Sequence, residues 1–272
     1  MSFNLYANGK KLSGDYPLGK LTEEEVGVFE SLRTYGQKIF REGEHLRRLT
    51  ESAKTVGFPL PPIPKLSEEL NAAVSAYFKE YPKSNDLFLR LTLNPESFFI
   101  MVGERKHSAN LYEQGIALKT SAVKRSLSNS SPPEVKTSSY QNAVFATLEV
   151  SANDTYEWVF LDQFGFVTEV RIGNLFIIKD GKIFTPPLLG ILNGVTRKFV
   201  IECAFQAGIE VKEVPITRHE IYNAGEAFLT NTSWEILPVR ELDRRRVGSS
   251  IPGEITKKLQ NIFREKVREE CP

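Results

Sequence analysis

Residues 161–197 decide the fold of this chain. They read LDQFGFVTEVRIGNLFIIKDGKIFTPPLLGILNGVTR, in which apolar runs of strand length alternate with glycine-containing turns. The last part, residues 190–197, places two glycines and Thr196 at the start of an amphipathic pattern. Backbone N–H groups, a threonine hydroxyl and a helix N-terminus together favour an anion site, usually for phosphate. The same residues also form an ordinary loop and helix cap, so both interpretations stand at this point.

The composition is that of a soluble globular protein with a sizeable core. Of 272 residues, 41% are hydrophobic, and 35 basic residues against 34 acidic ones give a formal net charge of +1. This balance gives no support to nucleic-acid binding or to attraction by an anionic membrane. We find no membrane-spanning run and no signal segment, so we expect a cytoplasmic protein. Cys203 and Cys271 lack metal-ligand spacing and the three histidines are scattered, so we expect no metal site.

The chain is expected to form two domains that both mix helices and strands, an α+β or α/β architecture. The Ser- and Pro-rich segment around residues 126–133 is the best linker. We therefore predict a small α/β domain over residues 1–120, a linker over 121–135 and a large domain over 136–272. Helices are predicted over 42–56, 67–81, 140–152, 196–206, 218–223 and 252–269, the last of them mostly solvated. Strands or hairpins are predicted over 3–12, 28–40, 87–93, 98–102, 116–120 and 210–214.

Three residues have positions that suit a phosphate-bearing cofactor. One of the two adjacent arginines at 47 and 48 must point towards the apolar side of its helix, where it needs a carboxylate or a phosphate oxygen. Lys136 follows the linker, and a lysine of lowered pKa forms Schiff bases. Glu169 ends an apolar strand, where a carboxylate can pair with a protonated pyridine nitrogen. A structural salt bridge, a solvated lysine and a turn-capping carboxylate are the alternatives.

Taken together, these residues resemble the class IV pyridoxal-phosphate enzymes. This fold type is shared by branched-chain aminotransferases, D-amino-acid aminotransferases and aminodeoxychorismate lyases. The resemblance covers nearly the whole chain in the right order. Its boxes are Phe29-Glu30-Ser31-Leu32-Arg33, His45-x-x-Arg48-Leu49, Lys136, Asp162…Gly165…Glu169-x-x-x-x-Asn174-Leu175-Phe176, Thr185-Pro186, Ile191-Leu192-x-Gly194-Val195-Thr196-Arg197, Glu226-x-Phe228-x-Thr230-Asn231-Thr232 and Pro238-Val239.

The resemblance implies a two-domain fold of the D-amino-acid aminotransferase type, with pyridoxal 5'-phosphate as cofactor. It implies that Lys136 is the catalytic residue, which forms the aldimine and moves the proton between the substrate α-carbon and the cofactor. It also implies that Glu169 keeps the pyridine nitrogen protonated. The other cofactor-binding residues that it implies are Arg48, Val195, Thr196 and Thr232 at the phosphate, Leu192 beneath the ring, Tyr140 at the phenolic oxygen, and Asn174.

The sequence departs from the family pattern mainly around the substrate. Residues 170–173 read Val-Arg-Ile-Gly, where the family usually carries serines or other small residues. Residues 23–27 read Glu-Glu-Glu-Val-Gly in place of the usual Tyr-Gly-x-Gly. These departures concern the substrate pocket more than the cofactor site. Arg90 and Arg171 are candidates to bind the substrate carboxylate, and surface salt bridging is the alternative for each. The candidate substrate-binding residues are Phe29, Arg90, Arg171 and Ser233.

The leading prediction is an aminotransferase that acts on a branched-chain or other hydrophobic amino acid and a 2-oxo acid, as a homodimer. Two observations bear on the alternatives. Residues 231–234 read Asn-Thr-Ser-Trp where branched-chain enzymes carry Gly-Thr-Ala-Ala, and Thr230-Asn231-Thr232 is close to the Thr-Asn-Ser of the lyases. Arg90 lacks the nearby histidine of the D-amino-acid enzymes. Aminodeoxychorismate lyase and a cofactor-binding protein without turnover remain alternatives, and L versus D stereochemistry stays open.

Overall fold

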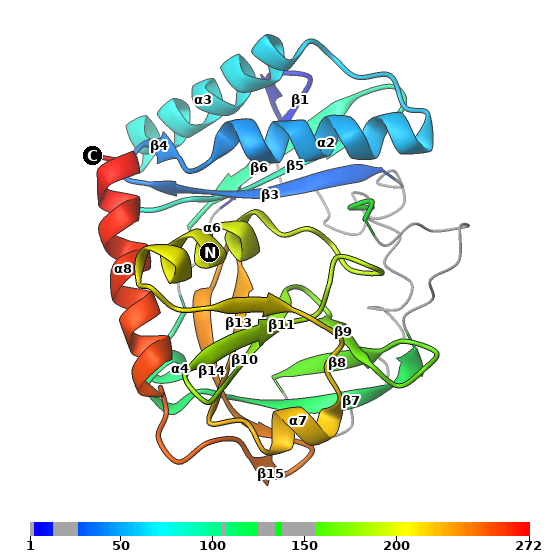
Figure 1. The fold of residues 1–272 in the computed structure, drawn as a ribbon. Coiled ribbons are helices and arrows are strands. Elements are labelled where there is room, and N and C mark those ends of the chain that lie inside the picture. Colours follow the sequence, from blue (N-terminus) through cyan, green and yellow to red (C-terminus); the bar gives the residue numbers. More distant parts are fainter. Residues whose placement is uncertain (1–2, 13–26, 105–106, 125–133, 138–155) are drawn as a thin grey trace. The chain divides into compact units, whose positions relative to one another are not determined.

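The computed structural model describes residues 3–12, 27–104, 107–124, 134–137 and 156–272. The chain divides into two compact units (Figure 1). Unit 1 comprises Met1–Lys106, Val135–Ser139 and Val267–Pro272, and unit 2 comprises His107–Glu134 and Tyr140–Lys266. Each unit is built from separate stretches of the chain that contact one another, so no single boundary in the sequence divides the two units. This division therefore differs from the expected division at 121–135, because residues 107–120 fall in unit 2 and the C-terminal residues fall in unit 1.

The predicted linker is only partly described. Its first four residues, 121–124, continue a strand instead of leaving the sheet. Residues 125–133, Tyr140 and the predicted helix 140–152 lie outside the described residues. The domain boundary within the linker therefore stays a prediction.

The described part of unit 1 has an antiparallel sheet that two helices, α2 and α3, cover. Within the described residues the strand order is β2-β1-β6-β5-β3-β4. The strands are β1 (Phe3–Ala7), β2 (Lys10–Lys11), β3 (Val28–Tyr35), β4 (Lys38–Ile39), β5 (Phe88–Leu93) and β6 (Phe98–Gly103), and the helices are α2 (Glu42–Val56) and α3 (Ile63–Glu80). Both predicted hairpins are confirmed, the second with its turn at Gly36-Gln37.

Alternation along β3 determines which face of this sheet is buried. Val28, Glu30 and Leu32 are buried and the residues between them are less so, because successive side chains point to opposite faces. Helices α2 and α3 pack on the buried face (Figure 1) and supply Leu49 and Leu70 to its core. Helix α3 begins at Ile63 rather than at the predicted residue 67. Its prolines occupy the N-cap and the first turn, where a missing N–H costs no hydrogen bond.

The described part of unit 2 has a mixed sheet and four helices. Its described strands follow the order β12-β11-β10-β13-β14-β7-β8-β9, and β15 pairs with β14. The pairs β11–β12, β14–β7 and β7–β8 are parallel and the others antiparallel. The strands are β7 (Ile116–Lys124), β8 (Glu157–Leu161), β9 (Val167–Val170), β10 (Asn174–Lys179), β11 (Lys182–Thr185), β12 (Val211–Glu213), β13 (Glu226–Asn231), β14 (Glu235–Leu242) and β15 (Arg245–Arg246), and the helices are α4 (Ala109–Gln114), α6 (Val195–Gln206), α7 (Arg218–Tyr222) and α8 (Glu254–Glu270).

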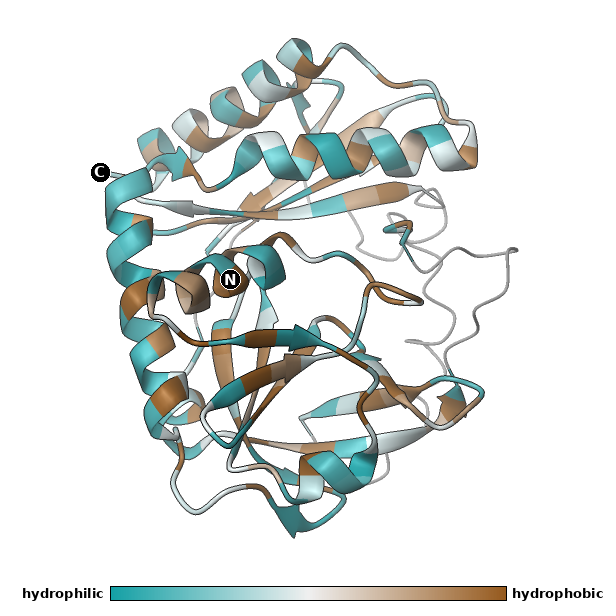
Figure 2. Ribbon diagram, in the orientation of Figure 1, coloured by the Kyte–Doolittle hydropathy of each residue, from teal (hydrophilic) through white to brown (hydrophobic). Residues whose placement is uncertain are grey.

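The stretch 161–197 forms the end of β8, then β9, β10 and β11, and the start of α6, so the predicted alternation of strands and turns is confirmed. The turn between β8 and β9 uses Gly165 at φ 90°, a conformation that favours glycine. Residues 174–178 of β10 are all buried, which explains the unbroken apolar run in the sequence (Figure 2). This run places the segment next to the core of unit 2.

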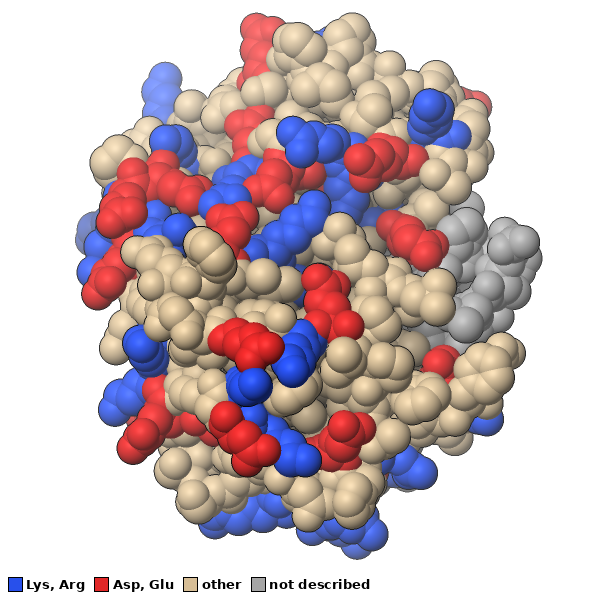
Figure 3. All heavy atoms as spheres, in the orientation of Figure 1, with Lys and Arg blue, Asp and Glu red and all other residues tan. Residues whose placement is uncertain are grey.

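Helix α8 buries one face instead of being mostly solvated as predicted. Leu259, Phe263 and Val267 recur on one stripe of the helix and are nearly inaccessible. The Glu226 carboxylate on β13 accepts hydrogen bonds from the Ile255 and Thr256 N–H groups, which fixes the first turn. Most of the remaining positions of α8 are charged. Basic and acidic side chains are interspersed over the face of the molecule shown in Figure 3. None of the helices in the described ranges is long and apolar enough to cross a membrane.

Candidate active site

In unit 1, a charged cluster joins β3 to α2. Arg48 donates from Nε and Nη2 to the two oxygens of Glu30, both at 2.7 Å. His45 Nδ1 lies 2.8 Å from Glu30 Oε2. All three side chains are buried, whereas the neighbouring Arg47 is exposed. The prediction that one of the two arginines points inward is therefore confirmed for Arg48, and its anion here is the carboxylate of Glu30.

Burial and ion pairing shift the pKa values of this cluster in opposite directions. Burial raises the pKa of Glu30, but the charge and hydrogen bonds of Arg48 and His45 outweigh it and lower that pKa to about 2. Burial lowers the pKa of His45, and Glu30 only partly opposes this. The cluster is therefore an ionised carboxylate, a guanidinium and a neutral imidazole that donates from Nδ1.

Lys136 lies beside β3 in the same unit. Its carbonyl accepts a hydrogen bond from the Phe29 N–H at 2.9 Å, its own N–H donates to Ser52 Oγ at 3.3 Å, and Thr137 bridges to Val28. The Lys136 Nζ lies 4.5 Å from the centroid of the Phe29 ring, and the Arg90 guanidinium lies 4.0 Å from it. Phe29 alternates with the buried Glu30, so these two cations gather on the face of the sheet that α2 and α3 do not cover. The structure thus brings together three residues predicted from sequence, Phe29, Arg90 and Lys136.

In unit 2, the first turn of α6 presents backbone N–H groups that can donate hydrogen bonds to a bound group. Its first intrahelical bond runs from the Lys198 N–H to the Gly194 carbonyl, so the N–H groups of residues 195–197 have no partner within the helix. Val195 and Thr196 are buried at this first turn. The segment before it is held by Asn174 on β10, whose Nδ2 donates to the Leu192 carbonyl at 2.9 Å. A side chain at Gly194 would collide with Asn174 Oδ1 and displace Asn174 from the Leu192 carbonyl, so glycine is favoured at this close approach.

Glu169 reaches the same segment from β9. Its Oε2 accepts a hydrogen bond from the Leu192 N–H at 3.0 Å, and it is 4% exposed. Leu192 is therefore bound through its N–H by Glu169 and through its carbonyl by Asn174. Thr230 lies directly opposite Asn174 in the sheet, so the two side chains share a face. The buried Thr230 Oγ1 has no hydrogen-bond partner among the described residues.

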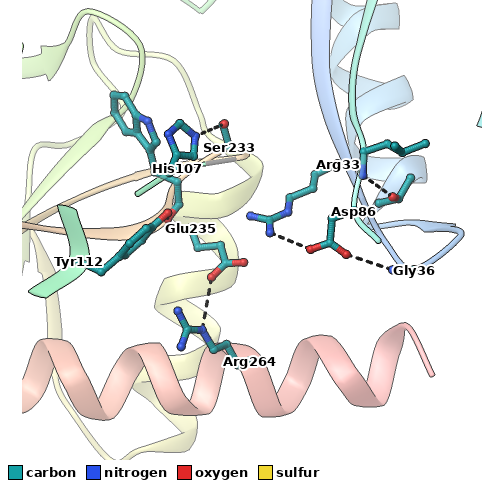
Figure 4. A network of polar contacts seen from close by, with 11 residues as sticks. Arg33, Gly36, Asp86, His107, Tyr112, Ser233, Glu235 and Arg264 are labelled. Atoms are coloured by element: carbon teal, nitrogen blue, oxygen red, sulfur yellow. Dashed lines mark hydrogen bonds and ion pairs between the residues drawn. The ribbon is translucent and has the colours of Figure 1, made fainter. Parts of the chain in front are cut away.

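The turn between β13 and β14 carries Thr232 and Ser233. Asn231 Oδ1 accepts the N–H groups of Ser233 and Trp234 at 2.9 and 2.7 Å, while its Nδ2 donates to the Ile172 carbonyl at 3.0 Å. Thr232 is partly exposed at the tip. His107 Nε2 lies 2.7 Å from Ser233 Oγ (Figure 4). An imidazole therefore stands beside a predicted substrate-binding serine of the same unit.

Arg171, in the turn between β9 and β10, pairs with an acidic residue of the core. Its Nε lies 3.1 Å from Oε1 of the fully buried Glu157 on β8. Burial raises the pKa of Glu157 to about 7, although Arg171 opposes the shift. The predicted alternative of a surface salt bridge does not describe this contact, because the carboxylate is inaccessible. Arg171 itself is partly exposed.

The structure thus places the predicted residues in two groups, one in each unit. Unit 1 holds Phe29, Arg48, Arg90 and Lys136, and unit 2 holds Glu169, Asn174, Leu192, Val195, Thr196, Thr232, Arg171 and Ser233. Sequence reasoning gave no role to four polar residues of these groups. Glu30 and Thr230 were present in the family motifs but were not assigned to the site, and His107 and Glu157 were missed. The alternation of Val28, Glu30 and Leu32 contained the signal for Glu30, but no local pattern marked His107.

Comparison with known proteins identifies the family. The chain matches the amino-transferase class IV family model over residues 27–242 and therefore belongs to that family. It is 35% identical over 252 residues to a putative branched-chain-amino-acid aminotransferase of Methanocaldococcus jannaschii, covering 88% of this chain and 86% of that protein. The crystal structure of a putative branched-chain amino acid aminotransferase from Thermotoga maritima superposes with a TM-score of 0.86 at 29% identity, covering 98% of this chain and 96% of that one. The branched-chain amino acid aminotransferase from Thermobaculum terrenum in its PLP-form gives a TM-score of 0.82 at 26% identity, covering 98% and 94%.

The protein is accordingly a pyridoxal-phosphate-dependent aminotransferase with the predicted fold, and its substrates are an amino acid and a 2-oxo acid. The residues in unit 2 fit this cofactor. The N–H groups left unpaired by the helix at the start of α6 suit a phosphate, and the unpartnered Thr230 hydroxyl adds a buried polar atom among the described residues of this unit. Glu169 offers a buried carboxylate, the partner that a protonated pyridine nitrogen requires. Pyridoxal phosphate supplies the electron sink of the reaction when bound.

Proposed function

We propose that the cofactor-binding and catalytic residues are those that the sequence resemblance implies. Lys136 is the lysine that binds the cofactor and moves the proton at the substrate α-carbon. Glu169 accepts a hydrogen bond from the protonated pyridine nitrogen, and Thr196 binds the phosphate from the first turn of α6. The observation that supports this assignment best is the pair of hydrogen bonds at the Leu192 backbone. Glu169 and Asn174 both bind this residue, so their side chains meet just before the start of α6. The proposed cofactor-binding set is completed by Arg48, Tyr140, Val195 and Thr232.

The proposed amino donor is a branched-chain or other hydrophobic amino acid. The supporting observation is that curated relatives named branched-chain-amino-acid aminotransferases are 33–35% identical over 87–88% of this chain. Phe29 offers an aromatic face for an apolar side chain, and Arg90 beside it offers a guanidinium for the substrate carboxylate. Arg171 is the weakest of the candidates, because its guanidinium already binds Glu157.

A homodimer and a cytoplasmic location complete the proposal. Leu188 and Leu189, in the loop before α6, are 39% and 73% exposed in the single chain. Adjacent exposed leucines favour coverage by another protein surface, and a second copy is the occupant that the family resemblance implies. The location in the cytoplasm stays a prediction from the sequence.

A substrate panel tests this function. Purified protein loaded with pyridoxal 5'-phosphate is mixed with individual L- and D-amino acids and with 2-oxoglutarate as the amino acceptor, and the 2-oxo acid formed from each amino acid is measured together with glutamate. We expect kcat/KM to be highest for L-leucine, L-isoleucine and L-valine. Activity only with acidic or D-amino acids would contradict the proposed substrate class.

The turn at residues 231–234 is the reason to include aminodeoxychorismate in the panel. The side chain of Asn231 accepts hydrogen bonds from two N–H groups of this turn. The branched-chain enzymes carry Gly-Thr-Ala-Ala here, and the glycine at the first position of that sequence cannot make these contacts. Pyruvate release from aminodeoxychorismate without any transamination would favour the lyase alternative. A protein that binds the cofactor but converts no amine would favour the alternative without turnover.

A further inference from the structure

Glu157 is a buried carboxylate in unit 2 that the proposed reaction does not use. Its side chain is completely inaccessible. Oε1 accepts hydrogen bonds from the Trp158 N–H and from Arg171 Nε, both at 3.1 Å. Oε2 is buried and has no hydrogen-bond partner among the described residues. The carboxylate therefore depends on one partly exposed arginine for its charge compensation.

This arrangement lowers the stability of the fold at neutral and alkaline pH. The pKa of Glu157 rises from 4.5 to about 7 because burial disfavours its charged form more than Arg171 favours it. A raised carboxyl pKa means that the folded protein binds the proton more tightly than the unfolded chain does, so stability falls as pH rises between these two values. A neutral residue of the same shape avoids this cost. Stability alone therefore does not explain a glutamate at this position.

The partner of Glu157 belongs to the turn that follows Glu169. This turn is fixed at four points. The Arg171 N–H donates to the Trp158 carbonyl at 3.1 Å, the Val170 N–H donates to the Gly173 carbonyl at 3.0 Å, and Asn231 binds the Ile172 carbonyl. The fourth point is the ion pair itself, in which the Arg171 side chain is tied to β8. Glu169 stands two residues before Arg171 on β9, where its carboxylate binds Leu192.

We propose that Glu157 is a positioning residue for Glu169, acting through Arg171 to hold the turn at residues 170–173. This inference deepens the proposed function and rests on it, because it takes Glu169 as the carboxylate at the cofactor nitrogen. Anchoring the turn to β8 limits the movement of the end of β9. The pyridine nitrogen then meets a carboxylate that is already in place, so that little reorganisation accompanies binding.

The other ionisable side chains on the strands flanking Glu157 are distinguishable from it. Lys119 and Lys124 on β7 are exposed, and Glu169 on β9 is bound to the Leu192 N–H. Protonation of Glu157 below pH 7 removes the charge that Arg171 binds. We therefore expect the contribution of Glu157 to cofactor affinity to be present above pH 7 and to fade as the pH falls towards about 6.

The test compares E157Q with the wild type and with E210Q. Glu210 pairs with Lys182 at 2.7 Å but is exposed, so the control makes the same substitution in an ion pair of unit 2 that solvent reaches. At pH 8 we expect E157Q to bind pyridoxal 5'-phosphate roughly tenfold more weakly, an effect of the size seen for outer residues that orient the ligands of a bound group. We also expect its cofactor-free form to melt at a higher temperature than the wild type. E210Q is expected to match the wild type in both measurements.

Loss of affinity together with gain of stability is the expected signature, because removing a merely structural ion pair would lower the melting temperature and leave the cofactor affinity unchanged. We further expect the difference in affinity between wild type and E157Q to shrink as the pH is lowered from 8 to 6. A lower melting temperature with unchanged cofactor affinity would overturn the proposal. So would a difference in affinity that stays constant across this pH range.

Arg171 supplies a second and independent test. R171A leaves the turn without its anchor, so we expect it to weaken cofactor binding by about the same factor as E157Q. The double variant E157Q/R171A is expected to bind no more weakly than either single variant, since both changes remove one interaction. Fully additive losses would contradict a shared role. Failure of the proposed function is distinguishable, because a wild-type protein that binds no pyridoxal 5'-phosphate would remove the basis of every comparison.

Discussion

At the scale of single residues, Arg48 is held by Glu30 through two parallel hydrogen bonds in a buried site. Such a pair depends on the planar fork of the guanidinium, which an ammonium group does not reproduce. His45 completes the cluster in its neutral form. A lysine at position 48 would therefore keep the positive charge but could not make both hydrogen bonds to Glu30.

The matched variants R48K and R47K test this geometry. R48K keeps the charge but loses one of the two bonds, so we expect a loss of about 1–3 kcal/mol in the free energy of unfolding. Arg47 is exposed in the same helix, and we expect R47K to change stability by less than about 0.5 kcal/mol. Urea unfolding at pH 7 measures both. Equal effects of the two substitutions would show that the bidentate pair does not stabilise unit 1.

The lowered pKa of Glu30 predicts acid sensitivity. Its folded value of about 2 lies below the reference value of 4.5, so its contribution is present above pH 4.5 and is lost as the pH falls towards 2. At pH 7 we expect E30Q to be less stable than the wild type by on the order of 3 kcal/mol, the cost of leaving Arg48 unpaired. Unfolding free energies at pH 7, 4 and 3 should show the two proteins converging as the pH drops. A difference that is independent of pH would contradict the ionised state of Glu30.

At the scale of elements, most of the sheet and helix pattern could be predicted from periodicity and turn residues. The run 161–197 folded as expected because glycines mark each turn and the buried part of β10 after Asn174 is apolar. Helix α3 began earlier than expected because prolines in a first turn do not show from spacing alone where a helix starts. Helix α8 was wrongly predicted to be mostly solvated, because its many charged residues outnumber the few apolar ones that form its buried stripe.

The roles of individual site residues could be predicted only from the sequence motifs of the family. Position alone did not separate Lys136 or Glu169 from ordinary surface residues, and their assigned roles remain proposals. The Arg171–Glu157 pair joins residues 14 apart on a strand and a turn, and His107 meets Ser233 across 126 residues. Such contacts depend on strand register and loop paths, which a single sequence does not define.

The start of α6 gives a prediction for G194A. The new methyl group would collide with Asn174 Oδ1, so either this side chain, which binds the Leu192 carbonyl, or the backbone must shift where the phosphate is proposed to bind. We expect cofactor affinity to fall at least about tenfold and stability to fall by about 1–3 kcal/mol, as for other overpacked sites. G43A in helix α2 is the control, because nothing lies within 4 Å of its added Cβ. Unchanged cofactor affinity in G194A would argue against a phosphate site at this turn.

At the scale of the whole molecule, one sheet-and-helix unit carries Lys136, and a second unit carries Glu169 and the start of α6. The proposed homodimer is tested by sedimentation equilibrium of the purified protein. We expect a mass of twice the 30.8 kDa chain. Replacing the exposed Leu189 by Asp should weaken the association if this loop is covered by the second copy. A monomer at micromolar concentration would contradict the proposal.

The assignment on which the proposed chemistry depends most is Lys136 as the lysine that binds pyridoxal phosphate. Borohydride reduction of the cofactor-loaded protein, followed by peptide mass spectrometry, locates the pyridoxyl group directly. We expect a single modified peptide that contains Lys136, and no modification of the K136A variant at the same cofactor concentration. A pyridoxyl group on another lysine, or on K136A as readily as on the wild type, would show that the assignment is wrong.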